Sequence, residues 1–106
     1  MRFGLNDSTV EKINSVFEKY PEVEEVIIYG SRAKGNYRNS SDIDITLKGE
    51  KLTTELLSKI ETDIDDLLTP YMFDVSVFKE LNSPDLENHI NRIGVTFYRR
   101  QKIEIR

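Results

Sequence analysis

The spacing of apolar residues changes repeatedly along this chain, and this alternation limits the folds open to it. Between Leu52 and Leu68, apolar side chains recur every three or four residues, which is typical of a helix with one buried face. Before and after this segment, in Asp42–Leu47 and Met72–Phe78, they recur every second residue, as in a strand. This alternation predicts an α+β (α/β two-layer) fold, a small mixed β-sheet with helices packed on it.

Proline, glycine and capping residues indicate where the remaining helices and strands begin and end. Ser8 and Glu11 have the spacing of a capping box, and Pro21 ends the helical pattern that follows them. The predicted elements are a helix over Ser8–Tyr20, a strand over Glu25–Tyr29, a short helical turn over Ser31–Lys34, a strand over Asp42–Leu47, a helix over Leu52–Leu68, a strand over Met72–Phe78, a helix from Ser83 to Gly94 and a short edge strand over Val95–Tyr98. With 106 residues and no repeat or linker, we expect residues 1–106 to form a single domain.

The composition excludes several kinds of site and partner. The chain has no cysteine and a single histidine, His89, so disulfides, thiolate sites and histidine-rich zinc sites are ruled out. Its net charge of -4 argues against nucleic acid as a partner, because affinity for phosphate backbones comes mainly from clustered Lys and Arg. No apolar run approaches the length of a membrane span, so we expect a cytoplasmic protein with no membrane partner.

Three aspartates are the first candidate site residues. Asp42 and Asp44 are two residues apart in a predicted strand and therefore point to the same side, where a divalent cation would relieve their repulsion. Asp74 is a lone carboxylate in a strand that we expect to be central, so it needs a partner. If the two strands are neighbours, the three carboxylates form one cluster suited to Mg²⁺. Two structural interpretations stay open: Asp42 caps a turn, and Asp74 is an edge-strand charge.

A Gly-Ser turn is the second candidate. Gly30 follows a predicted strand and lets the backbone approach a ligand closely, and Ser31 begins the short helical turn. Arg32 and Lys34 supply positive charge where a triphosphate would lie. By itself the turn is equally well explained as a capped turn with exposed basic residues. Together, a phosphate cradle and metal-binding aspartates are the parts that a nucleotidyltransferase needs.

The combined pattern resembles a known family. Gly30-Ser31, ten intervening residues and then Asp42-Ile43-Asp44 are similar to the G-S-x10-D-x-D signature of the DNA polymerase β-like nucleotidyltransferases. The short chain resembles in particular the minimal nucleotidyltransferases, the MNT antitoxins that are paired with HEPN toxins in prokaryotes. The resemblance covers nearly the whole chain and implies the palm-like fold of that superfamily.

The resemblance also implies roles for individual residues. Gly30 and Ser31 would bind the triphosphate of ATP, with Arg32 and Lys34 as weaker assignments. Asp42 and Asp44 would bridge two Mg²⁺ ions, and Asp74 would hold the catalytic ion and help to activate the acceptor. Family members of this size transfer AMP from ATP to a tyrosine hydroxyl of the HEPN toxin.

Larger relatives carry a further domain for the acceptor. Since only about thirty residues follow Asp74, fewer than an independent core needs, we expect a partner or a second copy of the chain to hold the acceptor.

Alternatives to this function remain. One is a noncatalytic nucleotide-binding antitoxin that acts on its partner by occlusion. Another is nucleotidyl transfer to a nucleic acid or small molecule, suggested only by the basic C-terminus. The intact aspartates and Gly-Ser favour an enzyme, because a purely occluding protein has no chemical need for them. The sequence leaves the acceptor, the nucleotide preference and the homo- or hetero-oligomeric state open. His89 is interpreted as structural or solvated, without a functional role.

Overall fold

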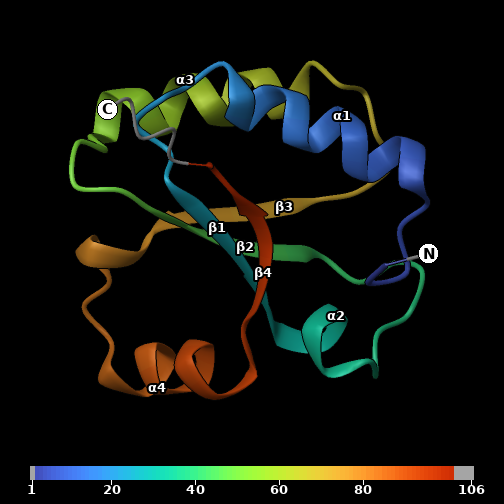
Figure 1. Cartoon of the computed structure of the whole chain (residues 1–106). Helices are drawn as coiled ribbons and strands as arrows, with labels where there is room; N and C mark the ends of the chain where they lie inside the picture. The colour runs from blue at the N-terminus through green and yellow to red at the C-terminus, as the bar shows by residue number, and fades with distance from the viewer. Residues whose placement is uncertain (1, 102–106) are drawn as a thin grey trace.

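The protein is a four-stranded mixed sheet with helices on both faces (Figure 1). The computed structural model describes residues 2–101, and all statements of structure below concern these residues. The elements in chain order are α1 (Asp7–Glu18), β1 (Glu25–Tyr29), α2 (Gly30–Lys34), β2 (Ile43–Lys48), α3 (Thr54–Asp65), β3 (Phe73–Val77), the 3₁₀ turn η1 (Phe78–Glu80), α4 (Pro84–Ile93) and β4 (Val95–Arg99). The strand order is β3-β2-β1-β4, in which β1 is antiparallel to β2 and β4, and β2 is parallel to β3.

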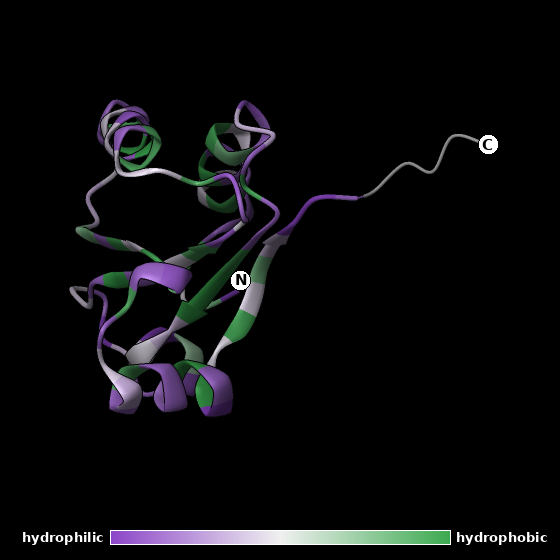
Figure 2. Cartoon of the chain, turned by 90° about the vertical axis from the view of Figure 1, so that its left-hand side faces the viewer, coloured by the Kyte–Doolittle hydropathy of each residue, from purple (hydrophilic) through white to green (hydrophobic). Residues whose placement is uncertain are grey.

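The main core lies between the sheet and the helices α1 and α3, which cover one face together (Figure 1). Its fully or almost fully buried side chains come from alternate positions of the strands and from the inner faces of the two helices. They include Ile13, Phe17, Val26, Ile28, Ile43, Ile45, Leu47, Ile60 and Ile64. Figure 2 shows this pattern as apolar colour concentrated on the central strands and hydrophilic colour on much of the helical surface.

A smaller apolar cluster lies on the other face of the sheet. Here α4 packs against β1, with Ile90 buried against Ile27 and Tyr29. The predicted α+β fold is therefore confirmed, and α4 adds a partial layer on the second face. Within residues 2–101, no helix has both the length and the apolar character that a membrane span requires.

Several predicted boundaries are corrected by the capping residues. Helix α1 begins at Asp7, because the Asn6 side chain caps it by accepting from the Thr9 N–H at 2.8 Å, so the predicted Ser8 capping box is wrong. Helix α3 is shorter than the apolar stripe that predicted it. Thr53 caps its start and it ends at Asp65, while Leu68 adopts a left-handed backbone (φ 56°) and is 88% exposed.

The last two elements follow the prediction. Ser83 caps α4 by accepting a hydrogen bond from the Leu86 N–H at 3.2 Å, and Pro84 occupies the first helical turn. Strand β4 follows directly after Gly94 and forms one edge of the sheet, as expected. The fold thereby brings the C-terminal end of β1, the start of β2 and the start of β3 together at one end of the sheet.

Candidate active site

The aspartates meet where three strands run side by side. Asp44 pairs with Tyr29 of β1 on one side and with Asp74 of β3 on the other. Paired residues of neighbouring strands point to the same face of a sheet, so the Asp44 and Asp74 side chains are neighbours. Asp42 precedes β2 by one residue and acts electrostatically on Asp44. Strands β2 and β3 are neighbours, which is the condition for the three carboxylates to lie at one end of the sheet.

The surroundings of Asp74 differ from the prediction. We expected a central strand and a buried carboxylate, but β3 is the outermost strand on its side and Asp74 is exposed. A solvated carboxylate needs no partner, and a charge on an edge strand also hinders unwanted strand pairing. Its position next to Asp44 is therefore the reason to keep Asp74 in the candidate site, and its exposure makes it accessible to a large acceptor.

The electrostatics of the site oppose ionisation of its central carboxyl. Partial burial raises the pKa of Asp44 above its usual value, and the negative charges of Asp74 and Asp42 raise it further. A positive charge on His89 would act in the opposite direction and lower the pKa of Asp44. Clustered carboxylates of this kind are stabilised in their charged forms by a cation.

The donor set fits Mg²⁺ by its chemistry. Carboxylate oxygens are the ligands that this hard cation prefers, and Mg²⁺ commonly takes its remaining ligands from water and substrate phosphates. Within the described part of the chain, however, no three His, Cys, Asp or Glu side chains are already arranged around a common metal position. Asp42, Asp44 and Asp74 would thus hold an ion together with a nucleotide instead of as a closed protein cage.

Gly30 joins β1 to α2, and two features of its position favour glycine over any other residue. Its φ is +73°, a left-handed conformation that other residues adopt with strain. A Cβ at this position would also lie 2.5 Å from Asp44 Oδ2. The turn is therefore in direct contact with Asp44, as a common site requires. Ser31 follows in a partly exposed position, and Lys34 is exposed at the end of α2.

Arg32 is not placed as predicted. Its side chain is only 2% exposed, and its guanidinium donates to the backbone carbonyls of Phe3 at 2.9 Å, Ser41 at 2.9 and 3.1 Å, and Asn39 at 3.3 Å. The rings of Tyr37 and Tyr71 flank it at 5.3 and 4.9 Å. Arg32 therefore fastens the loop that leads to Asp42, and this buried role replaces the predicted contact with phosphates.

Two residues near the site were given no role by the sequence. Tyr29 is 7% exposed beside the aspartates, and burial and the Asp74 charge raise the pKa of its hydroxyl. His89 of α4 accepts a hydrogen bond from the Gly30 N–H at 3.3 Å. A sequence signal for His89 exists: Leu86, His89, Ile90 and Ile93 have the spacing of the inward face of a helix.

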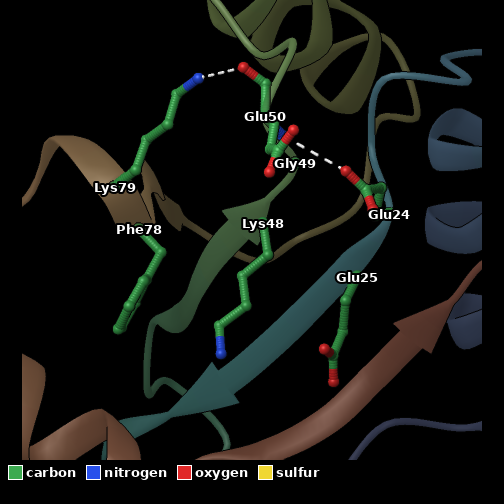
Figure 3. Close-up of a pocket in the computed structure, with 7 residues that line it drawn as sticks. All are labelled: Glu24, Glu25, Lys48, Gly49, Glu50, Phe78 and Lys79. Atoms are coloured by element: carbon green, nitrogen blue, oxygen red, sulfur yellow. Dashed lines mark hydrogen bonds between the residues drawn. The ribbon is translucent and has the colours of Figure 1, made fainter.

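The structure also has a separate surface pocket of about 440 Å³, and Figure 3 shows the residues that line it. It is lined by Glu24, Glu25, Lys48, Gly49, Glu50, Phe78 and Lys79. The Glu25–Lys48 pair is at the opposite end of the β1–β2 ladder from the Tyr29–Asp44 pair, about 13 Å away at the usual rise per strand residue. The Lys48 ammonium lies 4.6 Å from the centre of the Phe78 ring. None of the predicted site residues lines this pocket.

Two basic residues near the C-terminus, Arg99 and Arg100, make polar contacts within the fold. Arg99 forms an ion pair with Glu25 at 3.1 Å. Arg100 donates to the carbonyls of Phe17, Tyr20 and Val23, at the end of α1 and in the turn after it. Lys102 and Arg106 lie outside the described residues. Arg99 and Arg100 therefore do not form a free basic surface of the kind that binds nucleic acid.

The sequence comparison agrees with the geometry. Residues 11–103 match the family described as "Polymerase beta, Nucleotidyltransferase". The chain belongs to this nucleotidyltransferase family. Comparison with curated proteins finds no match.

Solved structures show the same fold in several proteins. A toxin–antitoxin crystal structure with AMP-PNP contains a chain of 19% identity with a TM-score of 0.69, and the match covers 92% of this chain and 76% of that one. A tri-AMPylated HEPN toxin from Shewanella oneidensis in complex with an MNT antitoxin gives 15% identity and a TM-score of 0.66, covering 91% and 74%. A candidate nucleotidyltransferase from Sulfolobus solfataricus gives 25% identity and a TM-score of 0.52, covering 86% and 77%. The expected resemblance to the MNT antitoxin fold is confirmed.

Proposed function

We propose that this nucleotidyltransferase transfers AMP from ATP to a hydroxyl acceptor, a tyrosine of a HEPN toxin, in a reaction that depends on Mg²⁺. The observation that carries the proposal is the direct contact between the Gly30 turn and Asp44, with Asp74 paired to Asp44 on the next strand. A phosphate-binding turn and adjacent carboxylates are useful together when a nucleotide and its cations occupy one site. Membership of the nucleotidyltransferase family supports this interpretation.

Each residue has a distinct task in the proposed reaction. Gly30 and Ser31 bind the triphosphate, and the exposed Lys34 adds positive charge near it. Asp42 and Asp44 would hold the cations, and Asp74, which is exposed on the edge strand β3, would hold one of them where a protein acceptor can approach. When bound, two Mg²⁺ ions would acidify the acceptor hydroxyl and stabilise the leaving pyrophosphate. The acceptor oxygen forms a bond to the α-phosphorus, and the bond from that phosphorus to the α,β-bridging oxygen breaks, so that pyrophosphate leaves. The hydroxyl proton passes to a nearby base or water.

The choice of a HEPN toxin as the acceptor is motivated by the structural relatives, and the choice of a tyrosine comes from the family resemblance alone. One of the similar structures holds AMP-PNP, and another contains a HEPN toxin that carries three AMP groups in complex with its MNT antitoxin. These statements concern those proteins, and they motivate a HEPN partner here. A hetero-oligomer of the two chains is the assembly that the proposal requires.

Intact-mass measurement tests this function. The protein is mixed with ATP, Mg²⁺ and the toxin encoded beside it, and the mass of the toxin is followed. We expect the addition of one or more AMP groups with the wild type and their loss with Asp42→Asn or Asp44→Asn. Asp65→Asn is the matched control, because Asp65 is an exposed aspartate of α3, outside the candidate site, and the charge change is the same. Equal modification by the wild type and by Asp44→Asn would refute the assignment of the site.

A noncatalytic antitoxin is the second candidate. It is favoured by one observation, namely that no three potential ligands within residues 2–101 are already arranged around a common metal position. In that case the toxin would form a stable complex with the protein without any change of mass. The same experiment therefore separates the two functions. Transfer to a nucleic acid has less support, because Arg99 and Arg100 are engaged within the fold.

A further inference from the structure

His89 contacts the Gly-Ser turn from α4, on the face of the sheet to which Asp44 also points. It lies on α4, which is fixed to the sheet by Ile90 packed against Ile27 and Tyr29. The Nε2 atom of His89 accepts a hydrogen bond from the Gly30 N–H at 3.3 Å. The imidazole also meets the Tyr29 ring edge-on, with 6.0 Å between the ring centres and 79° between the planes. These two contacts join α4 to the last residue of β1 and to the first residue of α2.

Gly30 is consequently restrained from two directions. Its N–H is held by His89, and its Cα lies so close to Asp44 that an added Cβ would come within 2.5 Å of Oδ2. A displacement of the turn toward α4 or away from it would change the spacing between Ser31 and Asp44. A partly buried N–H that loses its acceptor also carries a free-energy cost. The Nε2 atom of His89, as the hydrogen-bond acceptor of Gly30, is therefore well placed to determine where the turn lies.

We propose that His89 is a positioning residue of the nucleotide site, in which the lone pair of Nε2 fixes the Gly30–Ser31 turn against Asp44 and thereby sets the affinity for ATP. This inference rests on the proposed function, because it assumes that the turn binds a triphosphate. It assigns the neutral imidazole a definite tautomer, with the proton on Nδ1, because Nε2 must be free to accept.

Two substitutions of His89 distinguish the effect of its hydrogen-bond acceptor from the effect of its side-chain size. In His89→Gln, the side-chain amide reaches the place of Nε2 and its oxygen can accept from Gly30. In His89→Phe, a ring remains to contact Tyr29 but no acceptor is left. We expect His89→Phe to raise the Kd for ATP with Mg²⁺ about tenfold, which corresponds to one lost hydrogen bond. We expect His89→Gln to remain within about twofold of the wild type. Circular dichroism and thermal unfolding establish that both variants are folded.

A second readout needs no nucleotide. The amide of Gly30 should exchange with solvent about tenfold faster in His89→Phe than in the wild type or in His89→Gln, as followed by NMR. Long-range ¹H–¹⁵N spectra of the neutral imidazole should show the proton on Nδ1. Unchanged Gly30 exchange and an unchanged Kd in His89→Phe would overturn the inference, as would His89→Gln being as impaired as His89→Phe. Failure of the wild type to bind ATP would instead refute the proposed function, while Gly30 exchange would still test the contact with His89.

Discussion

Replacement of Gly30 by alanine should affect activity far more than stability, and the structure provides a matched control for this prediction. Gly30 and Gly35 both have a left-handed backbone, with φ of +73° and +90°. An alanine at either position should therefore lose about 1–2 kcal/mol of unfolding free energy from backbone strain. The two sites differ in their surroundings. A Cβ at Gly35 would have no atom within 4 Å, whereas a Cβ at Gly30 would lie 2.5 Å from Asp44 Oδ2.

The contact with Asp44 sets the size of the difference. The carboxylate is the movable end of a side chain, so it can rotate away at a cost of about 0.5–1.5 kcal/mol. We therefore expect Gly30→Ala to be about 1 kcal/mol less stable than Gly35→Ala. The displaced carboxylate is in the candidate active site, where a shift of about 1 Å can cost about a hundredfold in rate.

Urea unfolding and a transfer assay with the partner toxin check the two parts of this prediction. Gly35→Ala should keep transfer within a few-fold of the wild type, and Gly30→Ala should lose about a hundredfold. The reasoning would be refuted if the two variants were equally active. It would also be refuted if Gly30→Ala lost several kcal/mol more than Gly35→Ala, because the carboxylate would then be unable to move.

Three further predictions follow from the ionisable and buried polar groups. The pKa of Asp44 is raised in the folded state, so ionisation of Asp44 destabilises the protein as the pH rises through that pKa. Asp44→Asn should therefore increase the unfolding free energy at pH 7 by up to about 1 kcal/mol, and urea titrations should show this gain disappearing toward pH 3. Arg32→Lys should lower the free energy of unfolding by about 3 kcal/mol, because a single ammonium cannot replace the guanidinium donors to the carbonyls of Phe3, Asn39 and Ser41. A loss below about 0.5 kcal/mol in urea unfolding would contradict the buried structural role of Arg32. A hydrogen bond to Asp63 raises the pKa of Tyr20 to about 12. Asp63→Asn should return this pKa toward 10 and leave the raised pKa of Tyr29 in place, as followed by ultraviolet titration, whereas an unchanged titration would remove Asp63 as the cause.

The fold could be predicted well from the sequence where side-chain pattern and local capping agree. In α4, Ser83 caps the first turn and Pro84 occupies it, and the apolar spacing points the same way, so the start of the helix was predicted correctly. At the start of the chain, Ser8 and Glu11 have the spacing of a cap, but Asn6 accepts the hydrogen bond instead. Either residue type is a suitable cap, so the local pattern alone does not decide between them.

The candidate site was predictable in part. The contact between Gly30 and Asp44 follows from two elements that each carry a recognisable pattern, a strand that ends in Gly-Ser and a strand that begins at an Asp-x-Asp. The placement of Asp74 at an edge depends on strand order, which the periodicity of a single strand does not contain. The burial of Arg32 depends on carbonyls from Phe3, Asn39 and Ser41, which only the folded chain brings around one guanidinium.

The fate of the phosphorus atoms of ATP tests the central claim most directly. The protein, Mg²⁺ and the partner toxin are incubated with ATP labelled at either the α- or the γ-phosphorus, and label on the toxin is measured. A nucleotidyl transfer predicts label on the toxin from α-labelled ATP alone, with release of pyrophosphate. Label from γ-labelled ATP, or a stable complex with no label from either, would contradict the account.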